Sequence, residues 1–172
     1  AVARMNPDGS LDKTFGGGDG VATFGNALYT PSAVALGPDG SVLVLTVWSD
    51  GHSANEVIVR FTEAGELDPT FGDGGLAAVP HDPSSPLLVL GLHGLTVLPD
   101  GSVVATGDRP DQNPDSLLAV VRLTAKGTPD EAFGPDGVRT YKVGPWAEGD
   151  TVVRNADGSL LVVGRVGRPA AF

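Results

Sequence analysis

The chain has 172 residues, of which 41% are apolar, so it is long and hydrophobic enough to fold around a core of its own. Its 21 acidic and 11 basic side chains give a formal net charge of −10, which would repel the phosphates of a nucleic acid. The absence of cysteine excludes disulfides, thiolate metal sites and cysteine nucleophiles. The longest apolar run, Pro86 to Leu92, is too short to span a bilayer, and no signal peptide follows Ala1.

The first predicted strand, residues 1–5, runs into a motif that the chain repeats twice more. Its first copy, residues 4–16, reads Arg-Met-Asn-Pro-Asp-Gly-Ser-Leu-Asp-Lys-Thr-Phe-Gly. The motif arginine recurs at Arg60 and Arg122, so the spacings are 56 and then 62 residues. Arg, Gly, Asp, Phe and Gly keep their register in all three copies, which chance does not produce. We therefore divide a single domain into repeats of about 1–57, 58–119 and 120–172.

Between the motifs the sequence predicts short β-strands joined by Asp-Gly hairpins. In the first full period the expected strands are residues 21–24, 32–36, 41–47 and 56–61. The hairpin turn at Asp39-Gly40 returns at Asp100-Gly101 and Asp157-Gly158, each time between Val/Leu-rich segments. No stretch has the period of 3.6 residues that indicates a helix. Four short antiparallel strands in each period predict an all-β fold made of propeller blades.

The order of the predicted strands implies that one blade is divided between the two ends of the chain. Residues 1–5 match a fourth strand, whereas 138–143, 151–155 and 159–165 match strands one to three. The expected fold is a β-propeller segment of three four-stranded antiparallel blades, one of them split between N- and C-terminal strands. Three blades are too few for a ring. The chain is therefore either half of a six-bladed ring completed by another copy of itself, or part of a longer propeller whose further blades lie elsewhere.

The complete motif at residues 4–16 resembles the delta-60 repeat, a bacterial repeat of the propeller type with roughly this period. The resemblance covers essentially the whole chain, although Thr62, Thr124 and Ala132 depart from the first copy. It implies a secreted or surface-exposed bacterial propeller, so an extracellular or cell-surface location is expected. It provides no catalytic residues.

The recurring charged and aromatic residues are interpreted as scaffold. An Arg and an Asp eight residues later predict an ion pair that braces a turn, and a Phe three residues further on predicts a wedge between blades. These residues are Arg4, Arg60 and Arg122; Asp12, Asp68 and Asp130; and Phe15, Phe71 and Phe133. A ring of such pairs could instead bind an anion. The Asp-Gly turns lack the spacing of a calcium loop, and we expect no cofactor and no metal.

Ligand binding is expected on the variable loops, which alternate with the constant turns and should therefore share the opposite face. These loops are residues 25–31, 48–55, 79–94, 107–115 and 144–148. The candidate binding residues in this region are Tyr29, Trp48, His52, His81 and Trp146. Aromatic side chains on loops of a rigid scaffold are typical binding anchors. Each ring could instead pack over its own blade.

The chain carries no catalytic signature. A nucleophile elbow is absent, and the three histidines fall at unrelated phases of the repeat. We therefore predict a non-enzymatic module for binding or assembly, which takes a protein or a glycan through its variable loops. One alternative is a metal-assisted hydrolase or lyase that uses His81 and Asp82 in the central channel. Another is a purely structural surface component.

Overall fold

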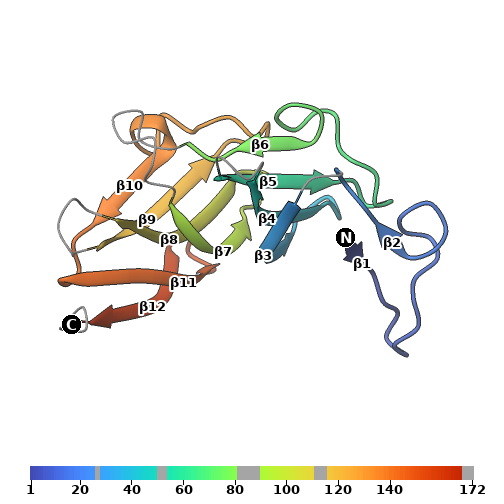
Figure 1. Cartoon of the computed structure of the whole chain (residues 1–172), viewed down its shortest axis with the longest axis horizontal. Helices are drawn as coiled ribbons and strands as arrows, with labels where there is room; N and C mark the ends of the chain where they lie inside the picture. Colours follow the sequence, from blue (N-terminus) through green and yellow to red (C-terminus); the bar gives the residue numbers. More distant parts are fainter. Residues whose placement is uncertain (26–27, 50–53, 81–89, 111–115, 168–172) are drawn as a thin grey trace.

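The structure is a computed structural model that describes residues 1–25, 28–49, 54–80, 90–110 and 116–167 (Figure 1). The strands form four antiparallel sheets, which follow one another in chain order. A three-residue 3-10 turn, Pro135–Gly137, is the one helical element of the described residues. No helix within these ranges is long and apolar enough to cross a bilayer.

Two of the sheets are complete four-stranded blades. The first blade contains β3 (Leu28–Leu36), β4 (Val42–Ser49), β5 (Ala54–Phe61) and β6 (Leu76–Ala78). The second blade contains β7 (Gly91–Val97), β8 (Val103–Pro110), β9 (Ser116–Leu123) and β10 (Val138–Tyr141). In both, each strand pairs antiparallel with the next strand in sequence. This meander is the architecture of a propeller blade, so the chain is a β-propeller segment, as the repeat predicts.

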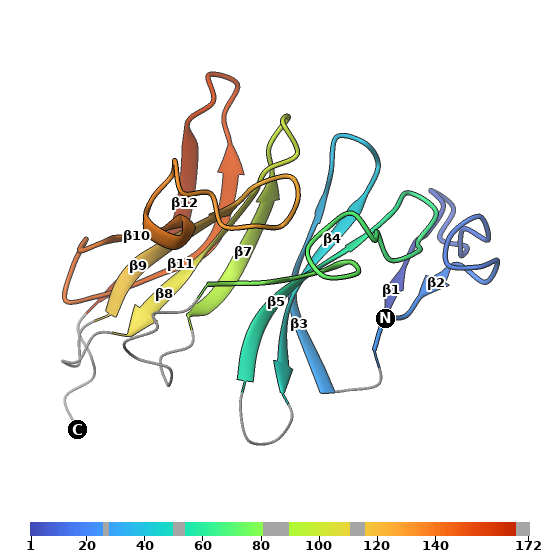
Figure 2. The same cartoon turned by 90° about the horizontal axis from the view of Figure 1, so that it is seen from above.

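The other two sheets are half-blades of two strands each. β1 (Val2–Ala3) pairs with β2 (Val21–Ala22) in the N-terminal half-blade, and β11 (Trp146–Arg154) pairs with β12 (Leu160–Gly167) in the C-terminal half-blade. By their place in the repeat, β1 and β2 are third and fourth strands, whereas β11 and β12 are first and second strands. The half-blades lie at opposite ends of the row of sheets (Figure 2) and are not paired with each other within the described residues.

The sequence-based assignment of strands to blades was wrong by one strand. Val21–Ala22 was expected to open the following blade, but it is the last strand of the preceding sheet. The reason is the path of the long connection after each motif arginine. The amide of Arg60 donates to the carbonyl of Gly75 at 2.9 Å, which returns the chain beside β5 instead of carrying it to the next blade. Each end of the described chain therefore carries two strands of a blade, rather than one strand at the first end and three at the other.

A hydrophobic cluster fills each boundary between successive sheets. The boundary between the two complete blades is filled by Leu43, Leu45, Ile58, Phe71, Leu92, Val103 and Val121. The N-terminal half-blade meets the first blade through Phe15, Ala22, Val44, Val59 and Phe61. The C-terminal half-blade meets the second blade through Val104, Val120 and Val152. Both faces of the middle strands of the complete blades, β4, β5, β8 and β9, are largely covered, which explains why these strands are almost continuously apolar in sequence.

The Asp-Gly turns between first and second strands all point to one side of the molecule, which we call the constant face (Figure 2). Each turn is closed in the same way, because the aspartate accepts hydrogen bonds from the amide and hydroxyl of the serine two residues later. At Asp39 these bonds come from Ser41, at 3.1 and 2.6 Å. Gly40 has a φ of 80°, a conformation that strains residues with a Cβ.

Candidate functional site

The motif arginine forms an ion pair with the aspartate eight residues later in every copy. Arg4 Nε donates a hydrogen bond to Asp12 Oδ2 at 2.8 Å. The matching Nε–Oδ2 distances are 3.1 Å for Arg60 and Asp68 and 3.0 Å for Arg122 and Asp130. All three aspartates also accept a backbone amide from two residues later. The pair therefore holds the turn that carries the chain from the third strand toward the fourth.

The same guanidinium also links neighbouring sheets. Arg4 Nη1 donates to the carbonyl of Glu63 in the first blade at 2.7 Å. Arg60 Nη1 donates in the same way to the carbonyl of Ala125 in the second blade at 3.1 Å. We call these boundaries seams. Arg4 and Arg60 each bridge one seam by a hydrogen bond to a backbone carbonyl at the same repeat position.

A backbone hydrogen bond closes each seam beside the arginine. The amide of Gly16 donates to the carbonyl of Ala64 at 2.9 Å, and the amide of Gly72 donates to the carbonyl of Lys126 at 2.8 Å. These two glycines directly follow the motif phenylalanines. The seam is therefore built from main-chain and side-chain bonds of the repeat itself.

The motif phenylalanines lie inside the seams. Phe15 and Phe71 are fully buried, each in a cluster that draws residues from the sheets on both sides. Phe133 occupies the equivalent place beside the C-terminal half-blade but remains partly exposed. The guanidinium of Arg4 lies 4.8 Å from the ring centroid of Phe15, which adds a cation–π contact to the packing.

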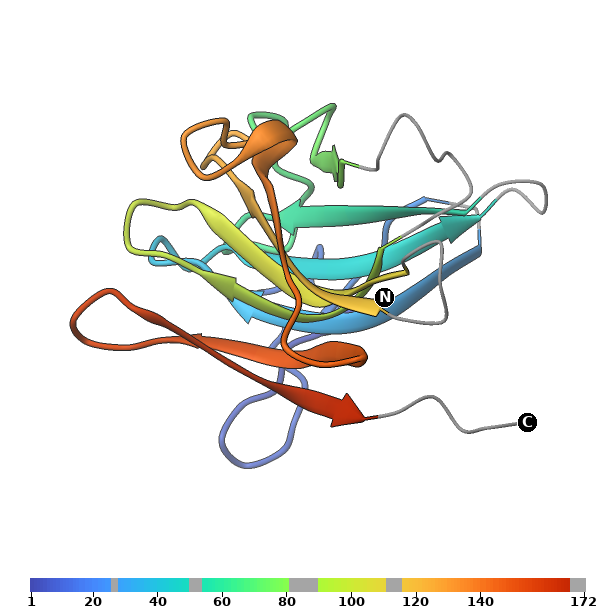
Figure 3. The same cartoon turned by 90° about the vertical axis from the view of Figure 1, so that its left-hand side faces the viewer.

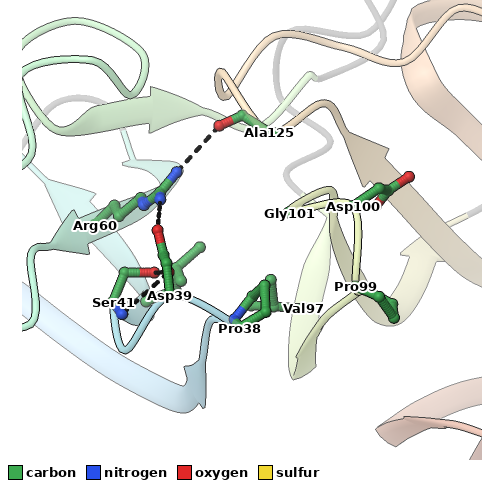
Figure 4. Close-up of a pocket in the computed structure, with 10 residues that line it drawn as sticks. Pro38, Asp39, Ser41, Arg60, Val97, Pro99, Asp100, Gly101 and Ala125 are labelled. Carbon is green, nitrogen blue, oxygen red and sulfur yellow. Dashed lines mark hydrogen bonds and ion pairs between the residues drawn. The ribbon is translucent and has the colours of Figure 1, made fainter.

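A pocket on the constant face opens between the turns of the two complete blades (Figure 4). Arg60 lies on one wall, with Nη2 2.5 Å from Asp39 Oδ2 and Nη1 donating to the carbonyl of Ala125. Asp100, on the far wall, is paired with Arg122 at 3.3 Å. The charged groups of the pocket are thus paired with other repeat residues, and we interpret it as part of the seam rather than as a ligand site.

The aromatic binding candidates lie in strands, not in loops. Tyr29 of β3 stands directly opposite Trp48 of β4, because the ladder between these strands extends beyond its predicted end. Phe24 packs edge-on against Tyr29 with ring centroids 4.8 Å apart, and Trp48 packs partly buried against the same cluster. Trp146 opens β11, with the guanidinium of Arg165 5.9 Å from its ring centroid. All three of these rings are half-buried, and the cluster that Trp48 contacts lies at the boundary between the N-terminal half-blade and the first blade.

His52 and His81, together with Asp82, lie outside the described residues. The proposed channel site that used His81 and Asp82 therefore has no described geometry. Within the described ranges, no three His, Asp or Glu side chains are grouped as a metal site. The turn aspartates instead accept hydrogen bonds from the serines of their own turns, as Asp157 does from Ser159.

The first strand of each blade contains a β-bulge at the same repeat position. The ladder skips one residue between Pro31 and Ala33, between Leu92 and Gly94, and between Gly149 and Thr151. The bulged residues are Ser32, His93 and Asp150. Bulges redirect side chains and are frequent near functional sites. The scaffold thus presents a different polar side chain in each repeat from one fixed position.

These first strands form the inner side of the arc of sheets. β7 lies against both β3 and β11, and Figure 1 shows the three together below the fourth strands β6 and β10. The bulged residues link neighbouring inner strands. Ser32 Oγ is 3.4 Å from the carbonyl of Leu92, and His93 Nε2 is 3.0 Å from Glu148 Oε1.

A group of polar residues surrounds the second and third bulges; we call His93, Asp108, Glu148, Asp150 and Arg165 the axial cluster. Arg165 Nη2 lies 2.9 Å from Glu148 Oε1 and 3.0 Å from Asp150 Oδ1. The hydrogen bonds that Arg165 donates to Asp150 are the main cause that raises the pKa of Arg165. Burial, and then the charge of Glu148, raise the pKa of Asp108. Three carboxylates against one arginine leave the cluster acidic, with a partly exposed histidine and arginine at its surface.

A buried carboxyl lies close to the axial cluster on its first-blade side. Glu56 of β5 is 5% exposed, and its Oε1 accepts the amide of Leu92 at 2.6 Å. Burial raises the pKa of Glu56 to about 8; the bond from Leu92 opposes this shift and the charge of Asp108 adds to it. The carboxyl is therefore protonated at neutral pH and ties β5 to β7.

Sequence reasoning missed the axial cluster. A signal was present, since Ser32, His93 and Asp150 occupy one repeat position and differ in every copy. The partners Glu148 and Arg165 gave no such signal, because their proximity depends on how β11 and β12 pack beside β7.

Comparison with known proteins supports the fold. A protein-family model described as a domain of unknown function (DUF5122) beta-propeller matches residues 1–15 and 98–133. The matched segments hold the first motif copy and the stretch from the Asp100 turn through the third motif to Phe133. No curated protein matched the chain, and no solved structure matched it.

Proposed function

We propose that the chain is a non-enzymatic propeller scaffold that binds a glycan at its axial cluster and the adjoining variable loops. The observation that carries this proposal is that the backbone is the same at each bulge, whereas the side chain there differs from repeat to repeat. The seam residues repeat from blade to blade, whereas the bulge position carries Ser32, then His93, then Asp150. Variation at a fixed position of a rigid frame is typical of a recognition surface.

The chemistry of the cluster favours an uncharged, hydroxyl-rich ligand. Glu148, Asp150 and Arg165 supply acceptors and donors, and Trp146 places an aromatic surface beside the arginine. Aromatic faces combined with a few polar groups recognise ligands with both apolar and hydroxyl surfaces. The net charge of −10 opposes the approach of an anionic ligand.

The resemblance of residues 4–16 to the delta-60 repeat supports a bacterial propeller that works outside the cytoplasm. The family model that matches the chain agrees with a propeller repeat and names no ligand. Secretion or display at the cell surface is thus a part of the proposal, in keeping with a glycan as the ligand.

A glycan array probed with the labelled 172-residue chain tests this proposal. We expect binding to a neutral oligosaccharide that Arg165→Ala and Asp150→Asn each weaken by about tenfold, the effect of losing one charge-assisted hydrogen bond. Arg154→Ala is the matched control, because Arg154 is an exposed arginine at the far end of β11. Binding to no oligosaccharide, or equal losses in all three variants, would contradict the proposal. Binding to basic peptides on a peptide array, without binding to any glycan, would indicate a protein ligand instead of a glycan.

A further inference from the structure

The buried carboxyl in the seam between the two complete blades departs from the repeat. Glu56 lies four residues before the motif arginine Arg60, whereas the residue four before Arg122 is Leu118. Leu118 reaches the next sheet, since a Cβ added at Gly149 of β11 would lie 2.9 Å from its Cδ1. An apolar side chain therefore fits at this repeat position.

A carboxyl is unfavourable at a place where a leucine fits. Moving a polar group from water into an apolar seam opposes folding, and an ionised group opposes it far more. Glu56 is nevertheless 5% exposed, and its burial raises its pKa to about 8. A group that packing does not require and that burial penalises points to a role other than filling the seam.

Glu56 holds the bulge that carries His93. Its Oε1 accepts the amide of Leu92 at 2.6 Å. The ladder between β7 and β8 shifts directly after Leu92, and His93 is the bulged residue. His93 Nε2 in turn lies 3.0 Å from Glu148 Oε1 in the axial cluster. The carboxyl thus anchors the residue before the histidine that links β7 to β11.

Within the described residues, the ionisable groups near Glu56 lie on the second blade. β4 and β6, which flank β5 in its own sheet, contain no titratable side chain, and Arg60 lies at the other end of β5, on the constant face. β7 contributes His93, and the charge of Asp108 on β8 raises the pKa of Glu56. A Cβ added at Gly91 would contact both Asp108 Oδ1 and His93 Nε2, so these two side chains lie over the same point of β7.

Loss of the Glu56 proton would destabilise this arrangement. An ionised Glu56 would place a second negative charge beside Asp108 in a buried seam. The carboxylate gains hydration only if β5 and β7 separate at this point, and the amide of Leu92 then loses its acceptor. Figure 3 shows the hairpin of β11 and β12, in orange and red, beside the second blade, and β11 packs against β7. A shift of β7 would therefore change the axial cluster.

We propose that Glu56 is a positioning residue of the axial cluster, whose protonated carboxyl holds the His93 bulge in the binding geometry and whose ionisation releases it. Binding at the axial cluster is therefore favoured at acidic pH and weakens as the pH rises toward 8. This inference rests on the proposed function, because it names what regulates binding at that site. Glu56 acts through Leu92 and His93 rather than by contact with the ligand.

Hydrogen exchange of the Leu92 amide, followed by NMR, measures this release without a ligand. The pKa of Glu56 is about 8 in the closed seam, against 4.5 for a glutamate in water, so closure is fully favoured below pH 4.5 and is lost as the pH rises toward 8. The protection factor of Leu92 should fall about tenfold for each pH unit between pH 5 and pH 8.

Two variants separate the proton from the side chain. Glu56→Gln keeps an acceptor oxygen without a charge, so the protection of Leu92 should not change with pH. Glu56→Leu copies the second blade and removes the acceptor, so the protection should be low at every pH, with circular dichroism as the check that the blades fold. Val120, buried in β9, reports unfolding of the whole chain. Exchange of Leu92 no faster than that of Val120, or the same pH profile in Glu56→Gln, would overturn the release.

The glycan array that tests the proposed function, read at pH 6 and at pH 8, supplies the second measurement. Oligosaccharides that bind the wild-type chain at pH 6 should bind it more weakly at pH 8. Glu56→Gln should keep its binding at pH 8, and Glu56→Leu should bind weakly at both. Equal loss at pH 8 in the wild-type chain and Glu56→Gln would overturn the inference. Binding to no oligosaccharide would refute the proposed function, while the exchange of Leu92 would still decide whether the proton of Glu56 holds the bulge.

Discussion

Replacing the buried Glu56 by Gln should remove most of the dependence of stability on pH above pH 5. Glu56 is 5% exposed between β5 and β7, and burial raises its pKa from 4.5 to about 8. The hydrogen bond from the amide of Leu92 lowers the pKa and offsets part of this rise. The folded state therefore binds the proton more tightly than the unfolded state does. The stabilisation is fully present below pH 4.5 and is lost as the pH rises toward 8.

The size of the effect follows from the difference between the two pKa values. Each pKa unit corresponds to about 1.4 kcal/mol, so the wild-type chain should lose about 4 kcal/mol more than Glu56→Gln between pH 5 and pH 8.5. Gln keeps an oxygen that can accept the amide of Leu92 and carries no charge at any pH. The raised pKa of Asp108 also makes stability fall as the pH rises, but it does so in both proteins. The difference between their pH profiles therefore reports on Glu56.

Urea unfolding at several pH values, followed by tryptophan fluorescence at one protein concentration, measures this difference. Glu66→Gln is the control, since Glu66 is an exposed carboxylate in the turn after β5. Its pH profile should run parallel to that of the wild-type chain. If Glu56→Gln also ran parallel, Glu56 would be ionised in the folded state and the reasoning from its burial would be refuted.

Two further predictions concern the seams. Phe71→Ala should lower the free energy of unfolding by about 3 to 5 kcal/mol, because Phe71 is fully buried between the complete blades. Tyr141→Ala, at a ring that is 42% exposed, should change it by less than about 1 kcal/mol, and equal losses in urea unfolding would contradict the wedge role. Gly65→Ala should lower the melting temperature more than Gly9→Ala, although both glycines have φ near 85°. A Cβ at Gly65 would lie 2.8 Å from the ring of Phe15, whereas Gly9 faces open space, so equal shifts would show that the seam can relax.

Much of the blade could be predicted from the sequence, because its signals are local and occur three times. The Asp-Gly turns and the apolar segments beside them indicate hairpins without reference to distant residues, and the structure has β3 with β4 and β7 with β8 at these places. The expected loop around Trp48 was wrong, since Trp48 and Tyr29 continue the ladder between β3 and β4. Cross-strand pairing of aromatic residues extended these strands beyond their apolar cores.

The assignment of strands to blades depended on a single contact between residues that are distant in sequence. Residues 62–75 could lead either to a new blade or back to the old one, and the spacing of the motif is compatible with both. The hydrogen bond from the amide of Arg60 to the carbonyl of Gly75 returns the chain to the same blade, where β6 pairs with β5. This return of the chain is the reason why each end of the described chain carries two strands of a blade.

The sequence by itself determined the repeat, the four-stranded blade and the residues that brace it, because each of these depends on contacts or spacings within one repeat. Only the tertiary structure decided where the repeats meet and what they present on the inner side. His93, Glu148 and Arg165 come from three strands of two sheets and converge because β11 packs against β7. The seam residues recur in every copy, whereas the polar contacts on the inner side leave no periodic trace in the sequence, since the residues at the bulges differ from one repeat to the next.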